Sequence, residues 1–247
     1  SGTEKVVADF VSRKSGVVAG IDMARAVLEE VGLTDIAVLV HDGTSLKAGD
    51  VLMTVRGDTR AILLAERTAL NFLGHLSGIA TLTRTWVDAV AGTKCEIRDT
   101  RKTTPGMRLL EKYAVRMGGG TNHRMSLSDA ALIKDNHIAA AGGVAEAFSK
   151  VRAKFPTSEI EIEVDTLDQL REVLPLKPDL VLLDNMSPAQ CAEAVSIVAG
   201  ATKLEASGGI SLENAKEYAA TGVNFLAIGA LTHSAPVFDI GLDLRAE

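Results

Sequence analysis

The feature that most restricts the fold of this chain is a repeated alternation of apolar and helical segments after Gly92. Six segments have the composition of buried strands: residues 95–100, 130–135, 159–165, 179–185, 202–209 and 225–230. Strands that alternate with helices over short links form parallel sheets. Six or seven such units in ~150 residues favour a β/α barrel, closed or incomplete, over an open doubly wound sheet. No G-x-G-x-x-G follows the first strand, which weakens a dinucleotide-binding alternative.

The residues before this region follow a different pattern. Residues 6–20 and 38–57 form short apolar segments separated by turn residues, which predicts strands. Residues 21–32 have helical periodicity that ends at Gly32. The N-terminal part is therefore predicted to be an α+β unit.

A long helical stretch from Arg60 to Gly92 joins the two patterns. We expect an interruption near Ser77-Gly78, because glycine weakens a helix interior. We predict an α+β domain at residues 1–70 and a β/α barrel domain at residues 71–235.

Composition excludes several classes of function. The net charge is −6 and the sequence pI is about 5.5, which argues against general binding to nucleic acid or to a membrane surface. No apolar run approaches transmembrane length. The two cysteines, Cys95 and Cys191, are far apart and lack CxxC spacing, which favours a reducing compartment. We therefore expect a cytoplasmic protein without nucleic-acid or membrane partners.

One block of this acidic chain is basic. Residues 98–134 contain eight Lys or Arg against three Asp or Glu, and also His123. Arg108, Lys112 and Arg116 recur at four-residue steps on a predicted helix, where we expect a solvated face. The remaining cations lie on loops or at strand ends and are candidates for an anion site: Arg101, Lys102, His123, Arg124 and Lys134. Arg98 and Asp99 lie within a strand, where we expect pairing with buried neighbours such as the glutamates.

Polar residues follow all six strands, where barrel active sites lie. They are Thr100 to Lys102, Lys134 to His137, Glu163 with Asp165, Asp184 with Asn185, Ser207 to Gly209, and Gly229. In residues 159–165, acidic residues alternate with Ile and Val. A half-exposed antiparallel strand with a solvated acidic face is one interpretation. In a parallel barrel both faces are covered, and buried carboxylates then need cations. Glu163 and Asp184 are predicted to bind Mg²⁺.

Two glycine turns indicate a phosphate site. Ser207, Gly208 and Gly209 precede a predicted helix, and Gly229 follows the next strand. Simple chain reversal is the alternative for each turn. His233 follows the second turn and is a candidate to line it, whereas His41 and His75 are expected to have structural roles.

Several segments resemble the quinolinate phosphoribosyltransferase family, also named nicotinate-nucleotide pyrophosphorylase (carboxylating). They are ERTALNFLGHLSGIAT, DTRKTTPGMRLLEKYAVRMGGGTNHR, ALIKDNH, IEVD, LLDN, EASGGIS and AIGALTHS, in the family's order and spacing. The similarity extends from about Val6 to Asp243. The family usually has a further segment before its first strand, so we expect the chain to be truncated there.

The resemblance implies an incomplete β/α barrel with an α+β open-faced sandwich domain, to which the C-terminal tail 236–247 returns. It implies a glycosyltransferase, more narrowly a pentosyltransferase, of de novo NAD biosynthesis. This enzyme joins quinolinate to phosphoribosyl pyrophosphate and yields nicotinate mononucleotide, pyrophosphate and CO₂. Mg²⁺ is the implied cofactor. The implied assembly is a homodimer or a multiple of dimers.

The resemblance also assigns roles to residues. Binding of the quinolinate carboxylates is implied for Arg101, His123, Arg124 and Lys134. Lys102 is close by and shared with the phosphoribosyl substrate, and Thr100 is a further candidate for substrate binding. Arg67 matches an arginine that reaches across the dimer. Glu163 and Asp184 match an acidic pair near the ribose and Mg²⁺, and Ser207, Gly208, Gly209 and Gly229 match the phosphate-binding loops. The implied catalytic residues are Lys102, Lys134, Glu163 and Asp184.

Three other functions stay open. One is a paralogous phosphoribosyltransferase with another acceptor, of the type associated with molybdate transport, which the large set of cations disfavours. A second is an aldolase that forms a Schiff base through Lys134. The third is a non-catalytic subunit that binds quinolinate without releasing pyrophosphate.

Overall fold

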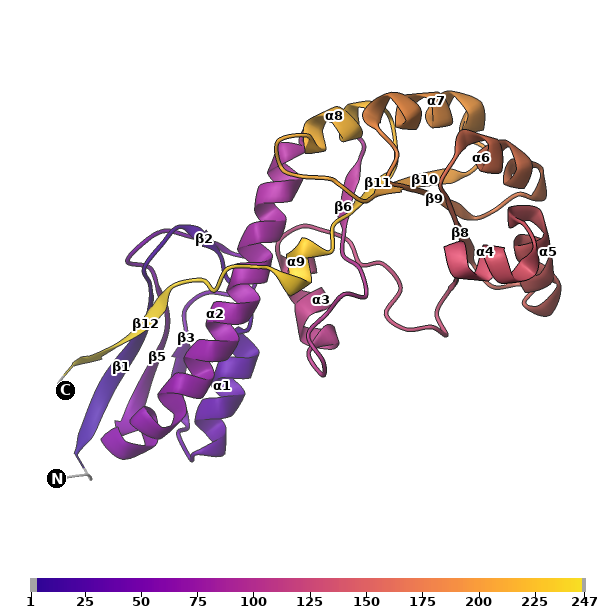
Figure 1. The fold of residues 1–247 in the computed structure, drawn as a ribbon. Coiled ribbons are helices and arrows are strands. Elements are labelled where there is room, and N and C mark those ends of the chain that lie inside the picture. Colours follow the sequence, from indigo (N-terminus) through magenta and orange to yellow (C-terminus); the bar gives the residue numbers. More distant parts are fainter. Residues whose placement is uncertain (1–3, 246–247) are drawn as a thin grey trace. The chain divides into compact units, whose positions relative to one another are not determined.

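The computed structural model describes residues 4–245, which belong to two compact units (Figure 1). Of the described residues, the sandwich unit comprises 4–85, 103–120 and 230–245, and the barrel unit comprises Trp86–Lys102 and Thr121–Gly229. Among the helices of residues 4–245, none has the length and hydropathy needed to cross a membrane.

These ranges differ from the predicted domains at 1–70 with 236–247 and at 71–235. Helix α2 (Thr59–Ala89) continues through position 70, and residues 103–120 pack with the N-terminal residues. Helix α2 is also unbroken at Ser77 and Gly78, so the predicted interruption is wrong.

Packing explains the small residues within α2. A Cβ atom at Gly78 would collide with the carbonyl oxygen of Pro236. The hydroxyl of Ser77 accepts a hydrogen bond from the Ala19 N–H at 3.0 Å and donates one to the Ala19 carbonyl at 3.1 Å. Because Ser77 and Gly78 are small, other backbone segments of the same chain approach α2 closely at these positions. A sequence pattern does not distinguish this role of a small residue from helix breaking.

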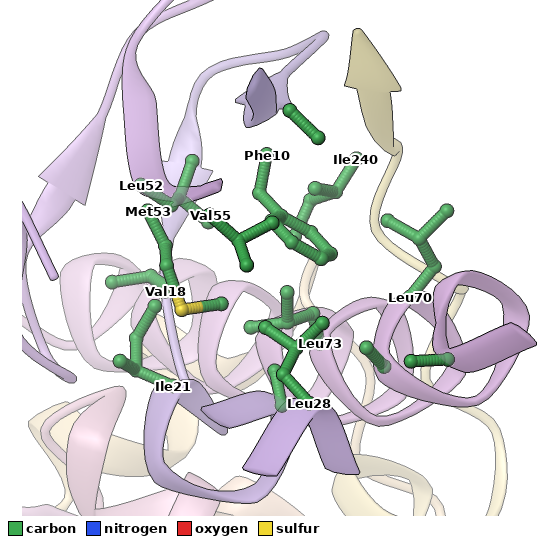
Figure 2. Packing of buried hydrophobic residues seen from close by; sticks show 14 of the residues in the cluster. Phe10, Val18, Ile21, Leu28, Leu52, Met53, Val55, Leu70, Leu73 and Ile240 are labelled. Atoms are coloured by element: carbon green, nitrogen blue, oxygen red, sulfur yellow. The ribbon is translucent and has the colours of Figure 1, made fainter. Parts of the chain in front are cut away.

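The sandwich unit is built on a four-stranded antiparallel sheet in the order β12-β1-β5-β3. The strands are β1 (Lys5–Ser12), β3 (Asp35–Val38), β5 (Val51–Asp58) and β12 (Ile240–Arg245). Phe10 of β1 lies opposite Leu242 on one side and Met53 on the other. One sheet face packs against α1 (Ile21–Glu30) and α2, and Figure 2 shows Phe10, Leu28, Val55 and Leu73 in this core.

Four short elements complete this unit: β2 (Gly16–Val17), β4 (Ser45–Leu46), α3 (Arg108–Met117) and α9 (Ala230–His233). The expected solvated face of α3 is wrong at Lys112, which is fully buried beside the equally buried Glu111. Glu111 contacts the His75 ring at 2.9 Å and accepts the Thr104 N–H at 3.0 Å. Helix α3 thus buries charged groups that have partners, which charge periodicity alone does not predict.

The substitution Phe10→Ala is expected to lower the free energy of unfolding by about 3–5 kcal/mol, because it leaves a cavity in a packed core. Phe10 is fully buried. Urea denaturation followed by circular dichroism measures the change. Leu39→Ala, at a side chain that is 56% exposed, is the control. A loss below about 1 kcal/mol for Phe10→Ala would contradict the assigned core.

The barrel unit contains a six-stranded sheet in the order β6-β11-β10-β9-β8-β7, with every pair parallel. The strands are β6 (Glu96–Arg98), β7 (Ala131–Ile133), β8 (Ile160–Val164), β9 (Leu180–Asp184), β10 (Lys203–Ser207) and β11 (Phe225–Ala227). All six predicted strands are therefore confirmed. Because β6 and β7 are both edge strands of this sheet, the predicted incomplete barrel is also confirmed.

Helices cover the outer face of the curved sheet (Figure 1). They are α4 (Asp135–Ala141), α5 (Val144–Lys154), α6 (Leu167–Val173), α7 (Pro188–Val198) and α8 (Ala215–Ala220), with a 3₁₀ turn at Leu174–Leu176. Helix α7 begins as expected, since the Ser187 hydroxyl accepts the Gln190 N–H. All five residues of β8 are buried, so the half-exposed antiparallel interpretation of this strand is wrong. Glu161 and Glu163 share the inner face of the sheet.

Candidate active site

A cavity of about 320 Å³ lies within the barrel unit, at the carboxyl ends of its strands. It brings together nine of the predicted site residues: Thr100, Arg101, Lys102, His123, Arg124, Lys134, Glu163, Asp184 and Ser207. Leu132, Leu182, Glu205 and Ala227 also line it. A larger hollow of about 610 Å³ includes Asp179 and Lys203 at the amino ends of β9 and β10. We favour the smaller cavity, because barrel active sites lie at the carboxyl ends of strands.

Two arginines mark the cationic side of the cavity. Nη1 of Arg124 donates a hydrogen bond to the Ala130 carbonyl at 2.8 Å, which orients the guanidinium. Burial lowers the pKa of Arg124, and the nearby positive charge of Arg101 lowers it further. Two crowded, partly desolvated guanidinium groups gain stability from an anion bound between them, so this side favours a carboxylate or phosphate ligand.

Carboxylates also line the cavity or lie close to it. One carboxylate oxygen each from Glu163, Asp165 and Asp184 lies within 4.8 Å of the others. Nζ of Lys134 contacts Oε2 of Glu163 at 3.1 Å. Burial raises the pKa of Asp184, and the charge of Asp165 raises it further.

This cluster fits the predicted Mg²⁺ site in its chemistry. All three donors are oxygens, as Mg²⁺ prefers, and a divalent cation relieves the repulsion that raises the pKa of Asp184. Asp165 joins Glu163 and Asp184 as a third candidate ligand. Its place at the end of β8 was visible in the sequence, but its proximity to Asp184 was not.

The glycine turn after β10 is tight because it contacts the end of β9. The Asn185 N–H donates to the Ser207 carbonyl at 2.9 Å. Gly208 has φ 84°, and a Cβ atom there would collide with the Asn185 side chain. Helix α8 begins only at Ala215, so the expectation that Gly208 and Gly209 directly precede a helix is wrong. The intervening residues form a turn instead.

Five predicted site residues do not line this cavity. They are Arg67, Gly208, Gly209, Gly229 and His233. Arg67 is exposed on α2, and His233 contacts the Ser234 hydroxyl at 2.7 Å, both within the sandwich unit. Their predicted contributions therefore stay predictions.

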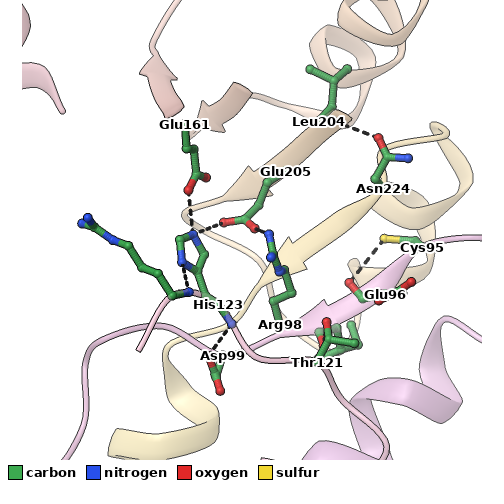
Figure 3. Close-up of polar contacts among 12 residues, drawn as sticks. Cys95, Glu96, Arg98, Asp99, Thr121, His123, Glu161, Leu204, Glu205 and Asn224 are labelled. Atoms are coloured by element: carbon green, nitrogen blue, oxygen red, sulfur yellow. Dashed lines mark hydrogen bonds and ion pairs between the residues drawn. The ribbon is translucent and has the colours of Figure 1, made fainter. Parts of the chain in front are cut away.

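A buried polar network lies beside the cavity (Figure 3). Nε2 of His123 is 2.8 Å from Oε2 of Glu161 and 3.5 Å from Oε1 of Glu205. Nη1 of Arg98 contacts Oε2 of Glu205 at 2.9 Å, so the expected pairing of Arg98 with a buried glutamate is confirmed. The Arg98 guanidinium also lies over the Phe225 ring at 4.1 Å. Burial raises the pKa of Glu205 to about 7, and the charge of Glu161 contributes to this shift.

Sequence reasoning missed Glu205 as a residue of the site. The available signal was its alternation with Ser207 on one strand, which places both on the inner face. No local pattern indicated that Glu205 would contact Arg98 and approach His123.

The sequence profile described as "Quinolinate phosphoribosyl transferase, C-terminal domain" matches residues 79–243, and that of the N-terminal domain matches residues 1–77. The chain belongs to the quinolinate phosphoribosyl transferase family. The nicotinate-nucleotide pyrophosphorylase (carboxylating) of Mycobacterium leprae is 55% identical over 97% of this chain and 86% of that protein. A probable nicotinate-nucleotide pyrophosphorylase (carboxylating) of Bacillus subtilis is 42% identical over 98% of this chain and 85% of that protein.

Solved structures confirm the fold. The nicotinate-nucleotide pyrophosphorylase of Francisella tularensis superposes with a TM-score of 0.96 at 39% identity, covering 99% of this chain and 88% of that one. The human nicotinic acid phosphoribosyltransferase has a TM-score of 0.68 at 12% identity, covering 99% of this chain and 71% of that one. The second likeness concerns the fold alone.

Proposed function

We propose that this chain transfers the phosphoribosyl group of phosphoribosyl pyrophosphate to the nitrogen of quinolinate, with loss of CO₂. The products are nicotinate mononucleotide, pyrophosphate and CO₂, which places the reaction in NAD biosynthesis; we propose a cytoplasmic location. The observation that carries this proposal is one cavity lined by two arginines, two lysines and the carboxylates of Glu163 and Asp184, which cluster with Asp165. The names of relatives at 55% and 42% identity support it.

The cationic side suits a planar dicarboxylate. Guanidinium groups bind carboxylates through two parallel hydrogen bonds, and Arg101 and Arg124 both line the cavity. Lys102 and Lys134 line it too and add point charges, with Lys102 shared between quinolinate and the phosphoribosyl substrate. Thr100 lies beside them.

The acidic side suits the ribose. Departure of pyrophosphate leaves positive charge on the anomeric carbon, which the Glu163 and Asp184 carboxylates stabilise at short range. Glu163, Asp184 and Asp165 would hold Mg²⁺, which when bound neutralises the leaving pyrophosphate. Ser207 lines the cavity, and the backbone of Gly208, Gly209 and Gly229 with His233 is proposed to face phosphate.

Decarboxylation follows from the chemistry of the product. A ribosylated ring nitrogen is cationic and withdraws electrons from C2. The bond to the C2 carboxylate then breaks, its electron pair stays on C2, and a proton from solvent or a nearby acid replaces CO₂. The arginines and lysines of the cavity hold the second carboxylate of the ring during this step. Binding and electrostatic stabilisation therefore account for most of the catalysis.

The proposed reaction is tested by turnover of quinolinate, phosphoribosyl pyrophosphate and Mg²⁺. We expect nicotinate mononucleotide and pyrophosphate in equal amounts, and at least a ~10²-fold slower rate after Mg²⁺ is chelated, since electrostatic stabilisation of the leaving group is lost. Nicotinate in place of quinolinate is expected to give no product. Equal use of both acids would contradict a site built for two carboxylates.

The same assay separates the alternatives. Quinolinate binding without pyrophosphate release would indicate a binding subunit, and transfer to a neutral acceptor would indicate the paralogous enzyme. An aldolase would be trapped by borohydride at Lys134. A Schiff-base nucleophile needs an uncharged amine, whereas Lys134 is placed as the cationic partner of Glu163, so we expect no trapping.

We further propose a homodimer, or a multiple of dimers, in which Arg67 of one subunit completes the cavity of another. The exposure of Arg67 on α2 and the resemblance of its segment to the family support this. Mixing Arg67→Ala with Asp184→Asn protein, each inactive alone, is expected to restore about a quarter of wild-type activity when subunits assort at random. Absence of recovery in verified heterodimers would contradict the sharing of Arg67.

A further inference from the structure

A short loop of the barrel unit, residues 125–130, connects Arg124 to strand β7. Each residue of this loop is exposed or half-buried, and the side chain of Leu127 is 70% exposed. A loop that buries so little apolar surface depends on its hydrogen bonds for a fixed conformation. The hydrogen bonds of the loop therefore decide where its two ends lie.

The carboxylate of Asp129 accepts three hydrogen bonds within this loop. Oδ2 accepts the backbone N–H groups of Met125 at 2.8 Å and of Ser126 at 3.0 Å, and Oδ1 accepts the Ser126 hydroxyl at 2.7 Å. These contacts lower the pKa of Asp129, with the Ser126 hydroxyl as the largest cause, so the group is ionised at neutral pH. One charged side chain thus closes the loop.

The guanidinium of Arg124 forms a second bridge across the same loop. Its Nη1 donates a hydrogen bond to the Ala130 carbonyl at 2.8 Å. Arg124 directly precedes Met125, and Ala130 directly follows Asp129, so the two bridges are nested. The position of the Ala130 carbonyl depends on how Asp129 closes the loop, and the guanidinium follows that carbonyl.

The charges of these groups support the same connection. Burial and the charge of Arg101 lower the pKa of Arg124, whereas the charges of Glu161 and Asp129 oppose this shift. Asp129 does not line the cavity, although Arg124 does. A carboxylate in contact with an anionic substrate would repel it, so the place of Asp129 outside the cavity suits a supporting role.

We propose that Asp129 is a positioning residue: its carboxylate closes the loop of residues 125–130 and thereby holds the Arg124 guanidinium in place for a carboxylate of the substrate. That this carboxylate belongs to quinolinate rests on the proposed function. Without the Asp129 carboxylate, the Ala130 carbonyl moves and Nη1 of Arg124 loses the acceptor that fixes it.

Nitrogen NMR of the Arg124 side chain tests this positioning without any substrate. Nε of Arg124 is shielded from solvent, and its N–H signal is identified by its absence from the spectrum of Arg124→Lys. In wild-type protein we expect a heteronuclear NOE close to that of the rigid backbone. In Asp129→Ala we expect a clearly lower NOE and about tenfold faster exchange with water. An equally ordered Nε–H in both proteins would overturn the proposal.

Steady-state kinetics measure the consequence for substrate binding. Asp129→Ala is expected to raise the KM for quinolinate about tenfold, because a misplaced binding group loses affinity, while kcat and the KM for phosphoribosyl pyrophosphate change less than about threefold. Asp129→Asn is expected to recover most of this loss, since its amide oxygen still accepts the two backbone N–H groups. Asp50→Ala is the matched control, because Asp50 accepts the Lys47 N–H in an exposed turn of the sandwich unit.

A double-mutant cycle shows whether Asp129 acts through Arg124. If it does, adding Asp129→Ala to Arg124→Ala changes the KM for quinolinate by less than about twofold, because the group that Asp129 positions is already absent. A further tenfold rise in the double variant, or no recovery in Asp129→Asn, would refute the positioning role.

These tests distinguish failure of this proposal from failure of the proposed function. If wild-type protein makes no nicotinate mononucleotide, the reaction is wrong, yet the NMR experiment still reports whether Asp129 holds Arg124. If wild-type protein is active and Asp129→Ala leaves the KM for quinolinate unchanged, the reaction stands and the positioning role is refuted.

Discussion

Replacing Arg124 with alanine is expected to lower kcat/KM for quinolinate by about 10²- to 10³-fold. Arg124 lines the cavity, and its Nη1 is already fixed by the Ala130 carbonyl. Truncating one partner of a desolvated, hydrogen-bonded charge pair costs roughly 2–5 kcal/mol, a range that includes the ~3–4 kcal/mol to which this loss corresponds. The KM for phosphoribosyl pyrophosphate should change by less than about threefold, because other residues bind that substrate.

Two further variants define the Arg124 experiment. Arg124→Lys keeps the charge but loses the planar fork, so we expect partial activity. Arg171→Ala removes an exposed arginine that pairs with Asp168 and Glu193 on the helical face, and it serves as the control. Initial rates over a matrix of both substrate concentrations give the parameters. Unchanged quinolinate kinetics in Arg124→Ala would refute its assignment to the carboxylate.

Asp184→Asn is expected to lower kcat by about 10²- to 10³-fold, because the substitution removes negative charge from the place where positive charge develops. The same substitution is expected to leave the melting temperature equal or higher. Burial and Asp165 raise the pKa of Asp184 in the folded state. A raised carboxyl pKa means that folding stability falls as pH rises through that pKa, so at neutral pH the ionised form is destabilising and the neutral amide is not.

The two readouts for Asp184→Asn are informative together. The activity is measured at saturating substrates, and the melting temperature is measured by thermal unfolding at pH 7. We expect the activity to fall while the melting temperature rises or stays the same. A large drop in melting temperature would indicate that Asp184 stabilises the fold, and the loss of activity would then not establish a catalytic role. Asp168→Asn, at an exposed carboxylate on α6, is the matched control.

Local patterns in the sequence were sufficient to predict most of the barrel. Short Val-, Ile- and Leu-rich segments separated by helical segments predict parallel strands whatever their partners, and each predicted strand occurs within its range. The same pattern places the following polar residues at one edge of the sheet. That is why Arg101, Lys134, Glu163 and Asp184 could be assigned to a single site before their distances were known.

Predictions failed where a residue's role depends on what packs against it. Gly78 was expected to interrupt a helix, yet it permits the approach of Pro236. Lys112 was expected in solvent, yet it is fully buried. In both cases the intrinsic preference is small compared with the free energy of packing, so tertiary contacts decide.

The sequence by itself determined the family, the order of the strands along the chain and the set of cations and carboxylates at their ends. Only the tertiary structure decided which of these groups touch. Glu161 and Glu205 come from separate strands, and both approach the ring of His123, which lies on a loop. The physical reason is that hydrogen bonds and ion pairs extend over a few ångströms in space, and residues distant in sequence reach that range only when the sheet forms.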